Sequence, residues 1–383
     1  MKKVLKFLSY VLVATVTSVA TMGVMVLSGY SPDSKLDELE NLINAQFIGE
    51  VDQTAIEDAA ATAMVYALGD RWSYYIPASE YQSYTEQMKN AYVGIGVTIT
   101  PAENGFEILK VEESGPAAEA GIQAGDIIVA IEGQSAAGMT SNEAGTLVKG
   151  EENTPVELTL RRGEEELTLS VTRKQVLTVV ASCEMLEGNI GLITIANFDA
   201  RCATETISAI MYLVEQGATA LIFDVRNNPG GYKDELVQVL NYLLPEGPLF
   251  RSEDFMGRET VDESDESCLE IPMAVLVNRE SYSAAEFFAA ALNEYDAAVV
   301  VGEQTVGKGY FQVTTKLSDG SAVGLSIGKY YTPNGVSLAD EGGLTPEIVV
   351  EVDDETFSAI YAGILEPADD PQIQAAIEAL QAQ

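Results

Sequence analysis

Two residues in this chain have types and surroundings that suit nucleophilic hydrolysis without histidine. Ser283 stands in the run 281–286, Ser-Tyr-Ser-Ala-Ala-Glu, and Lys308 stands between two glycines. The chain of 383 residues contains no histidine, which excludes a Ser-His-Asp triad, a Cys-His pair and a histidine-ligated zinc. A lysine can accept a serine proton instead, provided that burial keeps the lysine neutral. The pattern therefore predicts a Ser/Lys hydrolase.

The same residues also fit structural roles. Ser283 and Glu286 have the spacing of a capping box, with the serine as N-cap of a helix and the glutamate three residues on. A hydroxyl at a helix N-terminus also lies in positive potential, and the N–H of Ala284 is then available to an oxyanion. Ser281 is a competing nucleophile or cap. Lys308, taken alone, fits an exposed lysine in a glycine-rich hairpin.

A second motif ends a predicted buried strand. Residues 224–231 read Asp-Val-Arg-Asn-Asn-Pro-Gly-Gly, and they follow the apolar run 220–223. Proteins of the α/β class place their sites at the carboxyl ends of such strands. The N–H groups of the adjacent Gly230 and Gly231 can bind an oxyanion. A tight turn with an Arg/Asp pair is the structural alternative.

Hydrophobic patterning divides the chain into regions. Residues 33–90 have mostly helical spacing, and residues 91–174 form a compact β-rich module with short helices at 115–121 and 142–148. From about 177 to 365, strands at 190–195, 220–225, 273–277 and 298–301 alternate with helices at 204–216, 234–243 and 283–295. This order is typical of an α/β protein. Residues 366–383 fit a polar linker and a short terminal helix.

The module at 91–174 resembles a PDZ domain over its whole length. Its run 92–96, Tyr-Val-Gly-Ile-Gly, matches the loop that receives a peptide's C-terminal carboxylate on backbone N–H groups. The candidate binding residues are therefore Val93, Gly94, Ile95 and Gly96. The runs Gly-Pro-Ala-Ala-Glu-Ala-Gly at 115–121 and Gly-Asp-Ile-Ile at 125–128 stand at the distances that this resemblance requires. Alternatively, the two loop glycines shape a β-bulge.

Taken together, the strings from about Leu68 to Val350 resemble the C-terminal processing peptidases, also called tail-specific proteases. In that family a serine and a lysine placed as Ser283 and Lys308 form the catalytic dyad, and a glutamine matching Gln312 supports the lysine. The runs 330–335, Tyr-Tyr-Thr-Pro-Asn-Gly, and 301–303, Val-Gly-Glu, also match the family.

The resemblance implies an oxyanion hole made by Gly230, Gly231 and Ala284. This chain departs from the family around the nucleophile, where residues 280, 282 and 285 are larger than usual, and Glu294 stands where an aspartate is common. Tyr282 would crowd the neighbouring pocket, which leaves the side-chain preference open.

The implied fold class is α/β in a multidomain α+β arrangement. A targeting segment at 1–31 precedes a helical region at 32–90, a PDZ domain at 91–174, a crotonase/Clp-like catalytic domain at 175–365 and a tail at 366–383. The expected activity is that of a serine endopeptidase acting on proteins or peptides with free C-termini, with no metal or organic cofactor and with homo-oligomers left open. The alternatives are a catalytically inactive PDZ scaffold and a crotonase-type acyl-CoA enzyme.

The N-terminus predicts export. Lys2, Lys3 and Lys6 precede a run of 24 uncharged residues, 7–30. As a helix this run is about 36 Å long, enough for a hydrocarbon core of about 30 Å. The run lacks an Ala-x-Ala-like ending, which favours an uncleaved membrane anchor with the bulk of the chain outside the cytoplasm. Secretion after signal cleavage is the alternative.

The net charge argues against two classes of ligand, and the cysteines argue against a metal site. The chain has 59 acidic and 21 basic residues, a formal net charge of −38, spread along its length. Such a surface repels nucleic acid and an anionic acyl-CoA. Cys183, Cys202 and Cys268 are odd in number and lack metal-ligand spacing, so they are interpreted as idle thiols, with no support for a disulfide.

Overall fold

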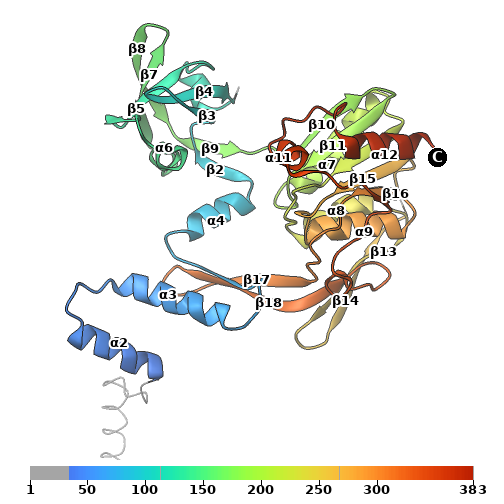
Figure 1. Cartoon of the computed structure of the whole chain (residues 1–383), viewed down its shortest axis with the longest axis horizontal. Helices are drawn as coiled ribbons and strands as arrows, with labels where there is room; N and C mark the ends of the chain where they lie inside the picture. Colours follow the sequence, from blue (N-terminus) through green and yellow to red (C-terminus); the bar gives the residue numbers. More distant parts are fainter. Residues whose placement is uncertain (1–33, 113, 267, 383) are drawn as a thin grey trace, which may run out of the picture. The chain divides into compact units, whose positions relative to one another are not determined.

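The computed structural model describes residues 34–382 except 113 and 267 (Figure 1). The chain divides into two compact units, with the boundary between Met64 and Val65. The predicted membrane anchor at 7–30 lies outside the described residues. Among the helices that are described, none is both long and apolar enough to span a bilayer.

The first unit consists of helical segments. Helix α2 (Lys35–Gln46) begins at Ser34, whose hydroxyl accepts the Asp37 N–H, and α3 (Gln53–Tyr66) runs into the second unit. Neither helix contains a buried residue. The predicted helical region also includes α4 (Tyr81–Met88) and a short strand, β1 (Tyr74–Ile76), which was not predicted.

Residues 91–177 form the expected β-rich module. A sheet in the order β3-β4-β5-β7-β8 is accompanied by β6, which pairs with β5, and by a separate β2–β9 pair. Its interior is a cluster of alternating apolar residues that includes Phe106, Ile128, Leu158 and Leu160. The elements are β2 (Ala91–Gly94), β3 (Val97–Ala102), β4 (Gly105–Val111), α5 (Pro116–Glu119), β5 (Ile127–Ile131), β6 (Gln134–Ser135), α6 (Ser141–Val148), β7 (Pro155–Arg162), β8 (Glu165–Thr172) and β9 (Lys174–Leu177).

A second domain is built on a six-stranded sheet in the order β10-β11-β12-β15-β16-β19. All neighbours from β11 onward pair in parallel, and β10 is antiparallel. Every residue of β12 and β15 is buried, because the sheet is covered on both faces. The strands are β10 (Ala181–Leu186), β11 (Ile190–Ile195), β12 (Ala220–Asp224), β15 (Met273–Val277), β16 (Ala298–Gly302) and β19 (Ile348–Val349).

Alternate residues of the central strands build two cores. Phe223 and Val275 pack with α7 (Cys202–Glu215), α8 (Lys233–Leu243) and α9 (Ala284–Glu294) on one face. Ile222 and Ala274 pack with Ile373 of α12 (Pro371–Gln381) on the other. The predicted short terminal helix is therefore part of the packed sheet domain. The short helices α10 (Leu338–Glu341) and α11 (Asp354–Tyr361) complete this part of the chain.

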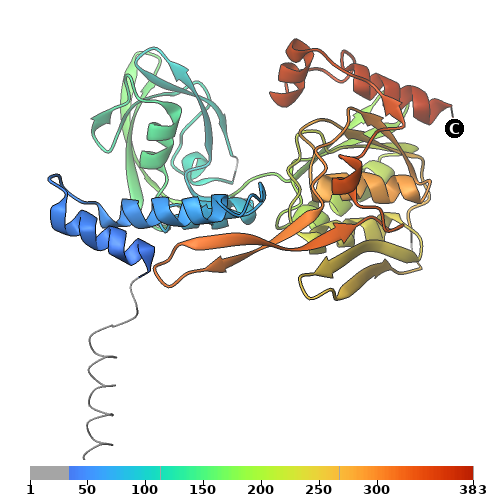
Figure 2. The same ribbon diagram turned by 60° about the horizontal axis from the view of Figure 1, so that its bottom comes forward.

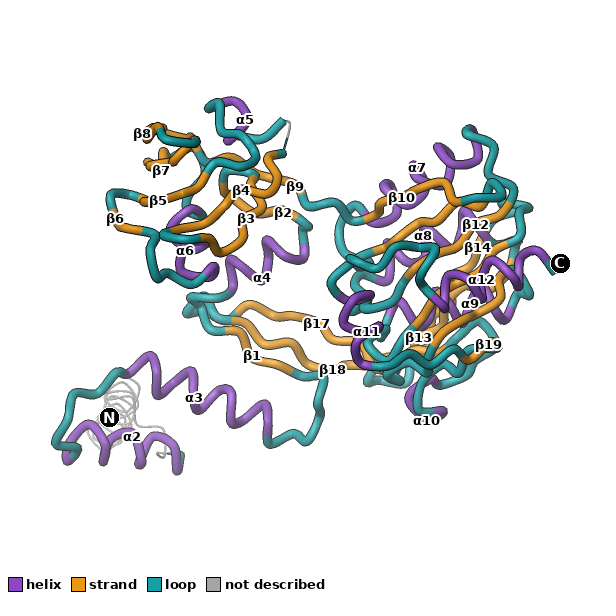
Figure 3. Tube along the Cα trace, turned by 45° about the horizontal axis from the view of Figure 1, so that its top comes forward, coloured by secondary structure: helices purple, strands orange, loops and turns teal. Residues whose placement is uncertain are grey.

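A smaller antiparallel sheet was not predicted. Its order is β1-β18-β13-β14, and β17 also pairs with β18 (Figures 2 and 3). Its members are β13 (Gly247–Asp254), β14 (Glu259–Ser264), β17 (Tyr310–Lys316) and β18 (Ala322–Tyr331). Most residues of β17 are only partly buried, so its sequence lacks a clear hydrophobic alternation. This sheet carries Gln312 and Tyr330 to the site described next.

Candidate active site

Ser283 occupies the turn between β15 and α9 and is the N-cap of that helix. Its φ of 59° and ψ of −127° are unusual for a residue with a side chain, and only 8% of it is exposed. Its N–H donates to the Glu286 carboxylate at 2.9 Å, which is the glutamate half of the predicted capping box. Its hydroxyl lies 2.7 Å from the hydroxyl of Tyr330.

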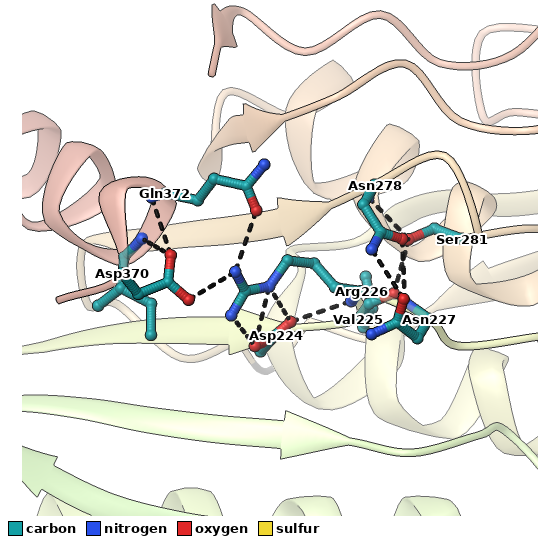
Figure 4. A network of polar contacts seen from close by, with 9 residues as sticks. Asp224, Val225, Arg226, Asn227, Asn278, Ser281, Asp370 and Gln372 are labelled. Atoms are coloured by element: carbon teal, nitrogen blue, oxygen red, sulfur yellow. Dashed lines mark hydrogen bonds and ion pairs between the residues drawn. The ribbon is translucent and has the colours of Figure 1, made fainter. Parts of the chain in front are cut away.

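Ser281, the competing candidate, has a structural role. It is completely buried, and its hydroxyl donates to the Val225 carbonyl at 2.8 Å and accepts the Asn278 N–H at 3.0 Å (Figure 4). These bonds hold the turn that carries Ser283 against the end of β12. The Ser281 hydroxyl is therefore used in the interior and does not line the cavity that contains Ser283.

Lys308 lies in the loop between β16 and β17, with its side chain over aromatic rings. Its Nζ is 5.0 Å from the ring centroid of Trp72 and 5.8 Å from that of Tyr282. Burial lowers the pKa of Lys308 to about 8, against the opposing attraction of Glu286 and Asp70. The exposed-hairpin alternative for this lysine is therefore wrong.

Glu286 joins the two loops that carry the predicted dyad. One carboxylate oxygen accepts the N–H groups of Ser283 and Lys308 at 2.9 Å each. The other accepts the Gly307 N–H at 2.7 Å and the Thr305 hydroxyl at 2.5 Å. Burial raises the pKa of Glu286, and these four hydrogen bonds oppose that effect. The sequence predicted only a helix-capping role for Glu286. Its bonds to residues 305–308 could not be predicted, because that loop is distant in sequence.

The three predicted oxyanion-hole residues lie together at the turn that carries Ser283. Their N–H groups differ in whether they already have a hydrogen-bond acceptor. The Gly230 N–H donates to the Asn228 side chain at 2.8 Å. Within the described part of the chain, the N–H groups of Gly231 and Ala284 have no acceptor in the hydrogen-bond network. A Cβ on Gly230, whose φ is +89°, would lie 2.6 Å from the Ser283 Cβ and 2.8 Å from the Ala284 nitrogen. Glycine is therefore required for this close approach.

The turn that carries these glycines is held by a buried arginine. Arg226 binds Asp224 through Nε and Nη2, and its Nη1 donates to Asp370 at 2.7 Å and to Gln372 at 3.0 Å (Figure 4). Asp370 is also the N-cap of α12. The predicted Arg/Asp pair thus exists, and it extends to a helix that lies far along the sequence.

Gln312 lies on the wall of the same cavity but does not support the lysine in this structure. Its side-chain amide donates to the Ser326 hydroxyl at 2.9 Å and to the Tyr310 carbonyl at 3.2 Å. Across the described residues it forms no hydrogen bond with Lys308. The cause is the register of the hairpin, which places Gln312 opposite Ser326 after an irregularity at Phe311.

A cavity of about 850 Å³ brings most of the predicted residues together. Ser283, Lys308, Gln312, Gly230, Gly231 and Ala284 all line it. Much of the remaining wall is aromatic, with Tyr74, Tyr81, Tyr84, Tyr232, Tyr282, Phe250, Phe311 and Tyr330. Tyr282 stacks on Trp72 at a centroid distance of 6.0 Å. The space and its open donors suit an extended peptide whose carbonyl reaches Ser283.

The predicted carboxylate loop of the β-rich module lies at the end of β2. Ile95 is buried, and Gly96 has a φ of +77°. The carbonyl of Ile95 accepts the Ala117 N–H and that of Gly96 accepts the Glu112 N–H, both at 2.9 Å. These bonds fix the loop against the segment that leads into α5.

Two further features of the described residues concern metals and thiols. In the ranges 34–382 without 113 and 267, no group of three or more potential side-chain ligands gathers around a common point. Cys183, Cys202 and Cys268 are free thiols, respectively half-buried, buried and exposed.

Comparisons with known proteins identify the family and the domains of this chain. Residues 189–350 match peptidase family S41, and residues 93–172 match the PDZ domain. The carboxy-terminal processing protease CtpA of Bacillus subtilis (strain 168) is 31% identical over 370 residues, covering 92% of this chain and 79% of that protein. A CtpA-like serine protease of Staphylococcus aureus (strain N315) is 30% identical, covering 83% of this chain and 64% of that protein.

The fold is shared with a solved structure as well. An S41 protease structure from Bacteroides fragilis NCTC 9343 superposes with a TM-score of 0.55 at 16% identity, covering 92% of this chain and 98% of that one. The chain belongs to the serine peptidases of family S41. Its relatives include a carboxy-terminal processing protease, and this chain also contains a PDZ domain. The predicted fold class and family are confirmed, and the acyl-CoA alternative is set aside.

Proposed function

We propose that this chain cleaves exported proteins near their C-terminal tails, with Ser283 as the nucleophile and Lys308 as the base. One observation carries the proposal: both side chains line one cavity, and burial lowers the pKa of Lys308 to about 8. A serine hydroxyl needs a base that is neutral near working pH, and a desolvated lysine meets that need. Glu286 supports the pairing because it binds the backbone of both loops.

The proposed reaction has two halves. Neutral Lys308 takes the proton of the Ser283 hydroxyl as Oγ attacks the substrate carbonyl carbon. The N–H groups of Gly231 and Ala284 stabilise the oxyanion, while that of Gly230 stays bonded to Asn228. The lysine then gives its proton to the leaving amine. In the second half, Lys308 takes a proton from water as the water oxygen attacks the ester carbon. Lys308 then returns this proton to Ser283 Oγ as the acyl–serine bond breaks and the acid product leaves.

The resting contacts must change for this reaction to start. The Lys308 Nζ lies over the Trp72 ring, and the Gln312 amide pairs with Ser326. We infer that a bound substrate rotates Lys308 Nζ from the Trp72 ring toward Ser283, where Gln312 can support it. Catalytic hydrogen bonds are often long or absent before substrate binds, so the resting geometry is compatible with this role.

The PDZ domain is proposed to capture the free C-terminal carboxylate of a substrate on the loop Val93, Gly94, Ile95 and Gly96. In a PDZ domain such a peptide adds as a strand to the sheet. Anchoring to the cytoplasmic membrane by residues 7–30, with the bulk of the chain outside, is the proposed location. Assembly into homo-oligomers is a further proposal for solution measurement.

The test is a cleavage assay on an unfolded protein that ends in an apolar C-terminal tail. Ser283→Ala and Lys308→Ala should each abolish cleavage, and the double variant should lose little more, because the pair acts as a unit. Ser281→Ala tests the competing nucleophile. It loses the bonds to Val225 and Asn278 and should weaken the turn, but it should keep measurable cleavage that depends on Ser283. Full activity in Ser283→Ala would refute the assignment.

An inactive PDZ scaffold is the second candidate. It predicts that free-carboxylate peptides bind with the same affinity to wild type and Ser283→Ala, and that neither protein cleaves them. Amidating the peptide C-terminus separates the two parts of the proposal. Loss of binding on amidation supports carboxylate capture, and equal binding and cleavage of both peptides would contradict it.

A further inference from the structure

Asp199 is a carboxylate in the cavity that the proposed reaction does not use. It lies between β11 and α7, and a Cβ on Gly231 would approach its backbone nitrogen to 2.6 Å. Among the described residues that line this cavity, it is the one acidic side chain. Only 6% of it is exposed, and its Oδ1 is buried without a hydrogen-bond partner.

A buried carboxylate oxygen without a partner is unfavourable, because it loses water and gains nothing in exchange. The neighbouring charge makes this worse, since Glu235 of α8 lies close enough to repel it. Burial, followed by Glu235, raises the pKa of Asp199 to about 7. The other titratable groups that interact with it are Tyr232, Tyr282 and Cys202.

Cations of the described chain do not supply the missing partner. Lys233 lines the cavity but donates to Asp262 at 2.9 Å. Arg201, two residues away in sequence, binds Glu205 through Nη1 and backbone carbonyls through Nη2, and its buried Nε forms no hydrogen bond with Asp199 or with any other described residue. Lys89 and Lys308 also line the cavity, and neither forms an ion pair with Asp199 in the part of the chain that is described. Within the described residues, Asp199 Oδ1 therefore has no cationic partner.

We propose that Asp199 binds a lysine or arginine side chain of the substrate, within a few residues of the scissile bond. A cationic side chain would satisfy Oδ1 and balance the repulsion from Glu235. The faces of Tyr232 and Tyr282 can hold its aliphatic stem and attract its charge. The net charge of −38 draws basic segments toward the protein. This inference rests on the proposed function for the peptide nature of the ligand and adds its side-chain preference.

The experiment uses the full chain and a matched peptide series. Each peptide carries one lysine at a different position around a fixed cleavage site, and its partner carries methionine there. We expect one position at which wild type favours lysine over methionine in kcat/KM by roughly ten- to a hundredfold. Asp199→Asn, which keeps the size of the side chain, should remove this preference and cleave the methionine peptide as wild type does.

Two controls keep the result interpretable. Asp234→Asn removes a charge from an exposed helix residue outside the cavity lining, and it should keep the lysine preference. Binding of the same peptides to Ser283→Ala, with and without Asp199→Asn, measures the preference without cleavage. A preference in binding that depends on Asp199 supports the inference even if no peptide is cut, which would then refute the proposed function. Equal cleavage or binding of lysine and methionine peptides at every position, or an unchanged preference in Asp199→Asn, would overturn the inference.

Discussion

The Ser283 hydroxyl lies 2.7 Å from the hydroxyl of Tyr330, a tyrosine buried at the end of β18. Burial raises the pKa of Tyr330, so the phenol keeps its proton over the working range. A phenol is a stronger acid than an alcohol, so Tyr330 is the natural donor in this pair. In the proposed reaction, the serine proton is then left for Lys308, and Tyr330 fixes the position of the attacking oxygen.

Tyr330→Phe should therefore slow the reaction and leave the fold intact. The variant loses the bond that orients Oγ but keeps the ring, which packs against Phe287 at a centroid distance of 4.6 Å. We expect kcat to fall by roughly tenfold with little change in KM. Steady-state kinetics measure the split. An unchanged kcat would show that the Tyr330 bond has no part in the reaction.

The lowered pKa of Lys308 predicts alkaline activation. The reactive form is the neutral amine, which predominates above the pKa of about 8, so kcat/KM should rise through this value and level off above it. Lys308→Arg should be inactive at every pH, since a guanidinium stays protonated. A rate that is flat between mildly acid and alkaline pH, with chemistry shown to be limiting, contradicts the lysine as base.

Glu286→Gln tests the connection between the two catalytic loops. Each carboxylate oxygen of Glu286 accepts two hydrogen bonds. In glutamine, an NH2 group replaces one of these oxygens, so it would point its hydrogens at two donors whichever way the amide is turned. We expect a loss of about 3 kcal/mol in the free energy of unfolding and at least about a hundredfold in kcat. Denaturant titration and kinetics measure both effects. Glu280→Gln, an exposed neighbour, is the control and should change neither.

Gly230→Ala tests the close approach at the turn that carries Ser283. The new Cβ would meet the Ser283 Cβ at 2.6 Å, so the turn must shift and activity should fall by at least about a hundredfold. Gly217→Ala is matched for strain, with a φ of +94° against +89°, but its Cβ meets open space. That control should cost about 1 kcal/mol of stability and keep its activity. Equal effects of the two variants would assign the loss to strain alone.

The raised pKa of Asp199 predicts a loss of stability whose size depends on pH. Its pKa in the folded state, about 7, lies above the ordinary value of 3.8, so the ionised form is disfavoured by folding. Stability is therefore lost as pH rises from about 4 toward 7, and it stays low above 7. Asp199→Asn should raise the Tm by at least about 3 °C at pH 8 and change it little at pH 4. Equal Tm values for wild type and Asp199→Asn at pH 8 would show that the ionised Asp199 carboxylate does not destabilise the folded state.

The motifs around the candidate site could be predicted from the sequence because each of them spans only a few residues. Ser283 with Glu286, the 224–231 turn and the buried runs of β12 and β15 are patterns within a few residues of one another. The proposed chemistry requires a lowered pKa for Lys308, but the sequence could not show how it arises. Trp72 and Tyr282, whose rings lie beside Lys308, come from other parts of the chain.

Other features depend on pairings that no local pattern specifies. Asp199 follows an ordinary strand, and its unpaired oxygen arises only when the surrounding elements exclude water. Gln312 was expected to support Lys308, but the irregular register of β17 against β18 turned its amide to Ser326. The half-exposed strands of that hairpin gave no periodic signal.

The pairing of Arg226 with Asp370 links the glycine turn to a residue 144 positions later. Chains leave the ribosome from the N-terminus, so Arg226 emerges long before the carboxylate and amide that complete its shell. Until the segment at 370–372 arrives, a buried guanidinium lacks two of its acceptors, and the turn that holds the oxyanion donors is incompletely fixed. The turn with the candidate oxyanion donors is thus fully braced only after the segment that begins α12 has been synthesised.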